Sequence, residues 1–142
     1  MGRIATVGLV VAVIISACGG ASGPRSPLDE GRSIYGNVCS ACHGSRGDGG
    51  TGPSLRDVIA TFPSCSDHIE WVTLGSKRWK DVHGDTYGAP GKRVEGGMPS
   101  HEASLEPEEI ARVVAFERIT YGGGAEDEVV ADCGVEESST TP

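Results

Sequence analysis

The chain has 142 residues, of which 37% are hydrophobic, 5% aromatic and 23% charged, and 22 are glycine. This length allows one small domain and excludes two separate cores, and so few aromatic side chains among so many glycines predict a loop-rich fold that needs a non-protein group in its interior. Twelve Lys and Arg against twenty Asp and Glu give a net charge of −8; because neutralising phosphates takes clustered positive charge, this balance argues against nucleic acid as a partner and favours a protein.

The first segment, residues 1–17, has the organisation of a secretory signal peptide. A positively charged start at Arg3 precedes an uncharged, mostly aliphatic run at residues 4–15, which leads into Ser16 and Ala17. A membrane-spanning helix wants about 20 apolar residues, so this shorter run makes a span the weaker interpretation. We therefore expect an exported protein.

Residues 15–18, with the sequence Ile-Ser-Ala-Cys, resemble the lipobox of bacterial lipoproteins. The resemblance implies that Cys18 becomes the lipidated first residue of the mature protein. The alternative is an uncleaved signal anchor with Cys18 as a bystander. Both place the domain on the outer face of a bacterial cell membrane or in the periplasm. The Gly, Ser and Pro residues that dominate the rest of residues 18–27 predict a flexible linker.

The middle of the chain, residues 28–121, carries the helical periodicity and is the only candidate for a folded domain. Three glycines at residues 122–124 end the last predicted helix. The rest of residues 122–142 contains six acidic residues and no basic ones. This composition predicts an acidic, mostly disordered tail.

Residues 39–43 have the sequence Cys-Ser-Ala-Cys-His, a C-x-x-C-H motif of the kind that attaches c-type haem. Thioethers from Cys39 and Cys42 reach the two vinyl groups on one edge of the porphyrin, and His43 places its imidazole under the iron. The alternatives are a thioredoxin-like redox pair and half of a zinc site. No strand of a βαβ unit precedes Cys39 and no second Cys or His pair follows at short spacing, so we expect one covalent haem.

From this motif outward, residues 28–121 resemble the class I c-type cytochromes, more specifically the small monohaem cytochromes of bacterial membranes. Gly31 and Tyr35 before the motif, and Val113 and Phe116 on a last helix predicted at residues 106–121, are similar to the family's contact between its first and last helices. The resemblance implies an all-α, loop-rich fold with three to five helices wrapped around one covalently bound haem.

The glycine-rich residues 44–55 resemble the family's loop on the proximal side of the haem. In that loop a proline carbonyl accepts the outer N–H of the ligand histidine. The resemblance implies that Pro53 orients His43 in this way and that Leu55 packs on the porphyrin.

Met98 is the candidate for the second axial ligand. It is the only methionine left once Met1 leaves with the signal, and its setting at residues 96–99, Gly-Gly-Met-Pro, resembles the family's distal ligand motif. A methionine that fills a gap in the core is the other interpretation. An open site also remains possible, and the rival ligands are His68, His83 and His101.

With His43 and Met98 both bound, the resemblance implies iron that stays six-coordinate in both oxidation states. Such a protein is a one-electron carrier between membrane or exported redox proteins, with no catalytic residue and no small-molecule substrate. Two alternatives stay open: an electron-entry subunit of a larger dehydrogenase or oxidase, and a five-coordinate haem sensor or peroxidase.

Cys65 and Cys133 remain after the other cysteines have been assigned. Because export places both in an oxidising compartment, they predict a disulfide. The alternative is that Cys133 is a free thiol or links to another chain, and that Cys65 is simply a small buried residue.

Residues 76–94 are locally basic and lead into the Met98 loop. These charges are candidates for steering an acidic partner to the haem edge. The alternative, which the sequence favours equally, is that they are solvated loop charges or partners of the haem propionates. Just before them, residues 67–74 predict a short helix that Ser66 or Asp67 opens and Gly75 closes.

Overall fold

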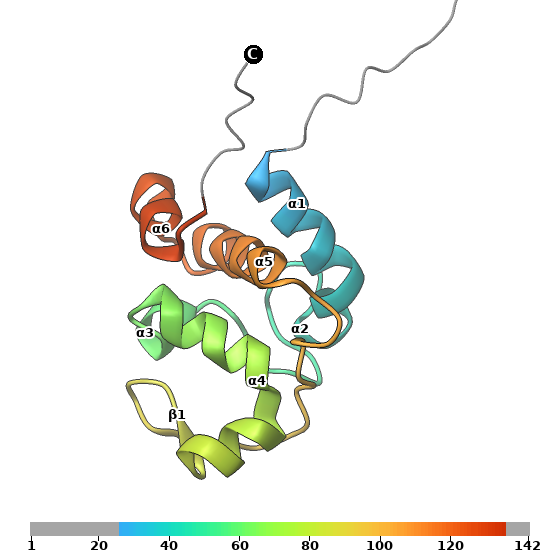
Figure 1. Cartoon of the computed structure of the whole chain (residues 1–142), viewed down its shortest axis with the longest axis vertical. Coiled ribbons are helices and arrows are strands. Elements are labelled where there is room, and N and C mark those ends of the chain that lie inside the picture. Colours follow the sequence, from blue (N-terminus) through green and yellow to red (C-terminus); the bar gives the residue numbers. More distant parts are fainter. Residues whose placement is uncertain (1–25, 136–142) are drawn as a thin grey trace, which may run out of the picture.

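The structure, a computed structural model, describes residues 26–135 (Figure 1). The predicted signal peptide, Cys18 and most of the predicted linker lie outside the described residues. The helical elements are α1 (Pro27–Ile34), the π-helical segment η1 (Tyr35–Cys39), α2 (Ser40–His43), α3 (Val58–Thr61), α4 (Cys65–His83), α5 (Pro107–Thr120) and α6 (Glu126–Cys133). Strands β1 (Thr86–Tyr87) and β2 (Lys92–Arg93) form a short antiparallel hairpin.

This mainly helical architecture confirms the predicted fold class. Six α-helices lie within residues 26–135, one more than the upper expectation, because α2 and α3 are single turns of four residues each. The small hairpin was not predicted. No helix in this part of the chain combines the length and the apolar character needed to cross a membrane.

The first helix begins at a capped N-terminus and runs directly into the C-x-x-C-H motif. Ser26 Oγ accepts a hydrogen bond from the Asp29 amide at 3.1 Å, and Pro27 occupies the first turn, where its missing N–H costs nothing. The helix then widens into η1, which ends at Cys39, and α2 ends at His43. One continuous helical path, from α1 through η1 to α2, therefore ends in the motif.

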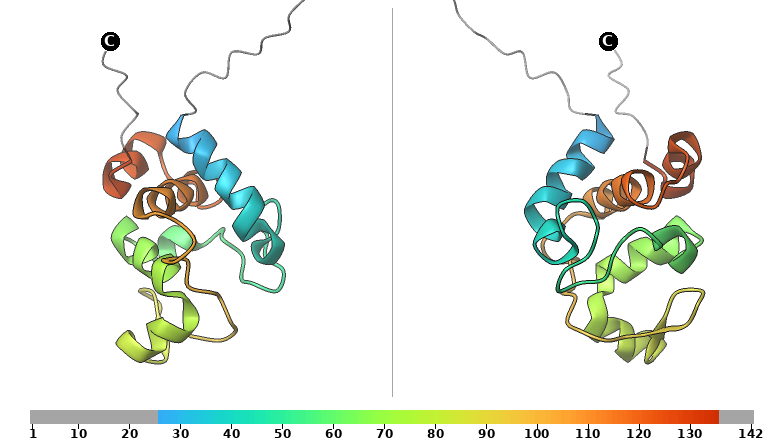
Figure 2. Two further views of the ribbon diagram at one scale, coloured as in Figure 1. Left: turned by 45° about the vertical axis from the view of Figure 1, so that its right-hand side comes forward. Right: turned by 180° about the vertical axis from the view of Figure 1, so that it is seen from behind.

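Helices α1 and α5 cross at close range (Figure 2). Gly31 makes this possible, because a Cβ there would overlap the carbonyl oxygen of Arg112. Next to this crossing, the rings of Tyr35 and Phe116 lie 5.7 Å apart and pack with the buried Val113. The contact expected between the first and last helices is present.

Helix α4 is longer than predicted and is bent in the middle. Its N-cap is Ser64, whose Oγ accepts from the Asp67 amide at 3.2 Å, and not Ser66 or Asp67. Gly75 leaves the helical conformation with φ 65° and ψ 175°, as a helix end would, but the chain resumes the helix after it and continues to His83. The continuation is stabilised by burial of Trp79, which packs edge-on against the core residue Trp71.

The prediction of a mostly disordered tail is wrong for the part that the structure describes. Residues 126–133 form α6, which packs against α5 and α4. Three acidic residues in its first turn suit a helix N-terminus, where the helix dipole attracts negative charge, and Val129 and Cys133 are buried on one face. The negative charges that suggested disorder therefore stabilise a short helix. Residues 136–142 lie outside the described part.

Cys133 of this helix lies next to Cys65 at the start of α4. Its sulfur lies at bonding distance from that of Cys65, with the two Cα atoms 5.1 Å apart. The neighbouring Asp132 accepts a hydrogen bond from the Cys65 amide at 2.8 Å and lies 3.6 Å from the guanidinium of Arg118.

Candidate functional site

A cavity lies between α2, the loop that follows it, α4 and the Met98 loop. It contains about 1240 Å³ of space free of protein atoms, part of which is open to solvent. Every residue predicted to bind a cofactor lines it. These residues are Cys39, Cys42, His43, Pro53, Leu55 and Met98. Cys65 and Cys133 are not among the lining residues, and Cys18 lies outside the described part of the chain.

Of the two cysteines of the motif, Cys39 is half-buried and Cys42 is exposed. Burial and, after it, the negative charge of Glu117 raise the pKa of Cys39 to about 12. A thioredoxin-like pair depends on a lowered thiol pKa, so the environment of Cys39 is the opposite of what such a pair requires.

His43 is held in one orientation by the loop that follows it. Its Nδ1 lies 2.8 Å from the carbonyl oxygen of Pro53, which requires Nδ1 to carry the proton and leaves the lone pair on Nε2. Gly52 lies so close to the imidazole that a Cβ there would be 3.0 Å from Cε1. The loop is closed further by a hydrogen bond from the Gly49 amide to the His43 carbonyl at 2.9 Å. The site thus provides an imidazole with a fixed tautomer.

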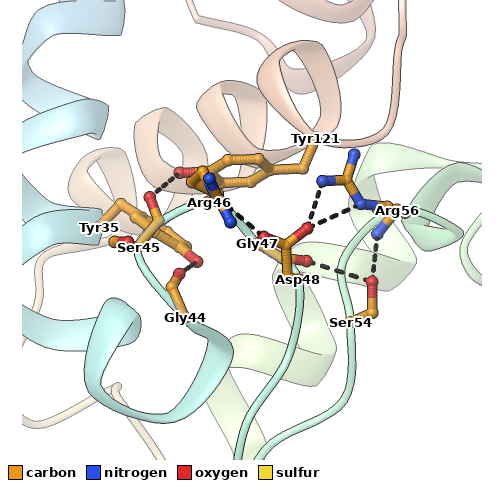
Figure 3. Close-up of polar contacts among 9 residues, drawn as sticks. All are labelled: Tyr35, Gly44, Ser45, Arg46, Gly47, Asp48, Ser54, Arg56 and Tyr121. Carbon is orange, nitrogen blue, oxygen red and sulfur yellow. Dashed lines mark hydrogen bonds and ion pairs between the residues drawn. The ribbon is translucent and has the colours of Figure 1, made fainter.

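Two tyrosines attach this loop to the helices behind it (Figure 3). Tyr35 Oη donates to the Gly44 carbonyl at 2.5 Å, and Tyr121 Oη donates to the Ser45 carbonyl at 3.3 Å. The ring of Tyr121 lies over Gly47, where a Cβ would overlap it. The proximal loop is therefore fixed to η1 and to the end of α5, and this fixes His43 indirectly.

An exposed ion-pair cluster closes the outer side of the same loop (Figure 3). Asp48 accepts hydrogen bonds from Arg56 and from Arg46, and these bonds lower the pKa of its carboxyl group. Solvent screens such pairs, so we assign them a minor part in stability.

The Met98 loop is bound to the kink of α4. The Ser76 amide donates to the Met98 carbonyl at 2.9 Å, and the Met98 amide donates to Ser76 Oγ at 3.1 Å. Pro99 passes so close to Gly75 that a Cβ on this glycine would overlap the proline carbonyl. The kink therefore exposes backbone groups that hold the half-buried Met98 at the cavity wall.

The three rival histidines have different surroundings. His83 does not line the cavity; its Nε2 lies 2.9 Å from Glu70 Oε1. His68 and His101 do line it, and burial lowers the pKa of both, that of His68 to about 3. His68 is stacked on Phe62 with ring centroids 5.0 Å apart. His83 therefore lies away from the cavity, whereas His68 and His101 both stay candidates beside Met98.

The donor set fits haem c. Two thiols three residues apart, an imidazole with a free Nε2 and a thioether all line one cavity. Its walls include apolar side chains that suit the faces of a porphyrin: Leu55, Val58, Trp71 and Val72. Within residues 26–135 no cluster of three or more His, Cys, Asp or Glu residues is arranged to hold a metal ion, as the second half of a zinc site would require.

Sequence reasoning missed Glu117, which also lines the cavity although it is only 4% exposed. Burial raises its pKa to about 8. The signal was available, because Glu117 lies four residues after Val113 and three after Val114, on the apolar face of the last helix.

Comparisons with known proteins identify relatives of this chain. Residues 26–116 match the family described as "Cytochrome C oxidase, cbb3-type, subunit III". A curated relative, cytochrome c-L of Methylorubrum extorquens strain AM1, is 29% identical over 105 residues, which are 74% of this chain and 46% of the relative. The chain thus spans about half the length of this curated relative.

Two solved structures are similar to parts of the chain. Cytochrome cL from Hyphomicrobium denitrificans has 27% identity and a TM-score of 0.46, with 65% of this chain and 46% of that one covered. Cytochrome CL from Methylophaga aminisulfidivorans MPT has 22% identity and a TM-score of 0.48, with 73% and 64% covered. Since the family match spans most of the described residues, the chain belongs to the c-type cytochrome family described as cytochrome c oxidase, cbb3-type, subunit III, and binds haem c covalently.

Proposed function

We propose that this protein is a one-electron carrier with a single haem c. The observation that supports this most directly is that Cys39, Cys42, His43 and Met98 line one cavity. In this assignment the two cysteines form the thioethers, and His43 Nε2 and Met98 Sδ are the axial ligands.

The chain's own residues suit electron transfer better than catalysis. Two protein ligands fill both axial positions, which leaves no place for oxygen or peroxide. The hydrogen bond from His43 to Pro53 keeps the imidazole in place, so little rearranges when the iron changes its oxidation state. A thioether ligand favours ferrous iron and raises the reduction potential.

An optical spectrum and a redox titration of the holoprotein test this function. We expect haem that survives acidic acetone extraction, the spectrum of a six-coordinate iron with His and Met ligands, and one reversible one-electron step. Rapid, tight binding of carbon monoxide by the reduced protein, or of cyanide by the oxidised protein, would instead indicate a five-coordinate sensor or peroxidase.

A second candidate function has the same chemistry with a permanent partner. The family description names an oxidase subunit, which favours an electron-entry subunit of a larger oxidase or dehydrogenase. Gentle detergent extraction followed by size-exclusion chromatography distinguishes the two. A free carrier elutes at the size of the single chain, whereas a subunit elutes together with the other components of a larger complex.

The partner in this proposal is a redox protein with an acidic docking surface. A groove beside the Met98 loop is lined by Lys77, Arg78 and Lys80 of α4 and by residues 96–100. This positive charge lies next to one of the two proposed ligands, where an electron would enter or leave.

We further propose that the protein is exported and anchored by lipid on Cys18. The support is the lipobox-like sequence after an apolar run. Cys18→Ser should abolish lipid labelling and leave the precursor unprocessed or the protein released from the membrane, whereas the wild-type protein should resist salt washing. A soluble wild-type protein whose N-terminus is not Cys18 would contradict the anchor.

A further inference from the structure

Glu117 of α5 and His68 of α4 form a buried pair at the wall of the cavity. Their side chains are 5% and 3% exposed, and Glu117 Oε2 lies 3.4 Å from His68 Nε2. Both residues line the cavity in which the haem is proposed to bind. Nδ1 of His68 has no hydrogen-bond partner in the described part of the protein. Burying two polar groups in this way is costly, and nothing in the proposed haem attachment uses them.

The groups around this pair offer the Glu117 carboxylate no compensating cation. From η1, Tyr35 faces it, and so does the thiol of Cys39, whose hydrogen bond lowers the pKa of Glu117 by less than burial raises it; Tyr121, the C-cap of α5, faces it as well. Arg118 is the next residue, but its guanidinium donates to the Phe62 and Pro63 carbonyls and pairs with Asp132 of α6. The guanidinium and His43 lower the pKa of His68 further, after burial, the largest cause.

The directions of the two pKa shifts place the one proton of the pair on the carboxyl group of Glu117 near neutral pH. Burial raises the pKa of Glu117 to about 8 and lowers that of His68 to about 3. The O–H of the neutral carboxyl group can then point toward Nε2 of the neutral imidazole as a hydrogen-bond donor. A low effective dielectric makes this arrangement sensitive to a change of one unit of charge nearby.

We propose that Glu117 takes up one proton from solvent when the haem iron accepts one electron, so that electron transfer by this protein is coupled to protonation. The inference rests on the haem site proposed above. One electron from a reduced redox protein would convert ferric to ferrous iron, and one proton from solvent would form the O–H bond of the Glu117 carboxylic acid. Since ferric haem carries one more positive charge than ferrous haem, the ferric state favours the carboxylate and the ferrous state the acid. His68 is the positioning residue, because its Nε2 is the hydrogen-bond acceptor that faces the Glu117 carboxylic acid.

The coupling predicts a sign for the pH dependence of the midpoint potential. The pKa of Glu117 is lower in the ferric than in the ferrous protein. Between these two pKa values the potential falls as pH rises, with a slope that approaches one proton per electron, and it levels off on both sides.

Spectroelectrochemical titrations of the holoprotein between about pH 5 and 10 test the proposal. The wild-type protein should show one sloping region, and Glu117→Gln should remove the slope while the optical spectrum keeps both axial ligands. Glu108→Gln is the matched control, because it makes the same change of charge on an exposed position of the same helix. It should keep the slope.

A slope that persists unchanged in Glu117→Gln would overturn the proposal and assign the proton to another group, such as a haem propionate. If this variant fails to bind haem, reduced-minus-oxidised infrared spectra of the wild-type protein decide. Reduction should produce the C=O band of one protonated carboxyl group, shifted in D₂O, and its absence would also overturn the proposal. In each case an intact spectrum with two axial ligands shows that the proposed electron carrier itself stands.

Discussion

At the scale of single residues, the orientation of His43 depends on one carbonyl group. Pro53 has no amide proton of its own, and its carbonyl oxygen lies 2.8 Å from Nδ1 of the imidazole. The two residues are ten positions apart along the chain, and Gly52 between them removes the side chain that would push the ring away. The ligand and its hydrogen-bond partner are thus parts of one short loop.

Met98→Ala tests the proposed second ligand. The oxidised protein should lose the weak sulfur-to-iron absorption band near the red end of the spectrum, and the midpoint potential should fall by on the order of 100 mV, because a thioether stabilises ferrous iron. Covalent attachment of the haem should survive on a denaturing gel. His83→Ala is the control, since His83 does not line the cavity. If Met98→Ala leaves the spectrum and the potential unchanged, His101 becomes the ligand to test.

At the scale of elements, the kink of α4 links the helix to the Met98 loop. The amide of Ser76 and the carbonyl of Thr73, on either side of Gly75, are both bonded to the loop that carries Met98. A straight helix would keep these groups for its own hydrogen bonds. The bend therefore exposes the backbone groups that hold this segment.

Gly75→Ala should lower stability and disturb the Met98 loop. The backbone of Gly75 has φ 65° and ψ 175°, a region that costs other residues about 1–3 kcal/mol, and a Cβ would also overlap Pro99. Gly84→Ala is the control, because Gly84 has φ 92° and ψ −164° but open space around its Cα. Denaturant unfolding should show a loss for both variants, larger for Gly75→Ala. Only Gly75→Ala should weaken the sulfur-to-iron band. Equal spectra for the two variants would contradict the link between the kink of α4 and the Met98 loop.

Helix α6 is tied to the fold through the Cys65–Cys133 pair, and we propose that this disulfide forms in the exported protein. The double variant Cys65→Ser/Cys133→Ser leaves no unpaired thiol at this position. A cross-link across a sequence separation of 68 residues is worth about 4 kcal/mol in the chain-entropy model. Denaturant unfolding should show a loss of up to this size, and the midpoint potential should stay the same because the pair lies outside the cavity. Alkylation of native Cys65 without prior reduction would contradict the bridge.

At the scale of the whole molecule, an acidic helix and a locally basic segment lie far apart. Helix α6, with its acidic first turn, lies at one end, and the second half of α4, with Lys77 and Lys80, lies at the other (Figure 1). The net charge of −8 alone would favour basic partners. The proposed function instead relies on the groove beside Met98, where Lys80 and the ion-paired Lys77 and Arg78 would meet an acidic protein.

Lys77→Gln/Lys80→Gln tests this groove without knowledge of the natural partner. Oxidation of the reduced protein by ferricyanide, an anion, should slow by about threefold at low salt, and the difference should shrink as ionic strength rises. Lys77→Gln alone, compared with Arg46→Gln outside the groove, gives the same change of net charge at two places. The same rate for these two single variants would show that only net charge matters.

Much of the haem site was predictable because the residues of the attachment motif are close neighbours along the chain. The spacing of Cys39, Cys42 and His43 is a property of neighbouring residues, and so are the caps of α1 and α5. The proximal loop was predictable through its resemblance to the family. The bend of α4 was not predicted, because Gly75 was expected to end the helix, and a glycine that ends a helix and one that kinks it look the same along the chain.

The sequence by itself determined the haem motif, helices α1 and α5 and the mainly helical class, because each depends on spacings within one segment. Only the tertiary structure decided that α6 is ordered, that His83 lies away from the cavity, and that Glu117 meets His68. These features depend on burial between segments far apart along the chain. Helical spacing places Glu117 on the apolar face of α5, but it does not say which segment covers that face, and only the packing of α5 against α4 brings Glu117 to His68 and removes it from water.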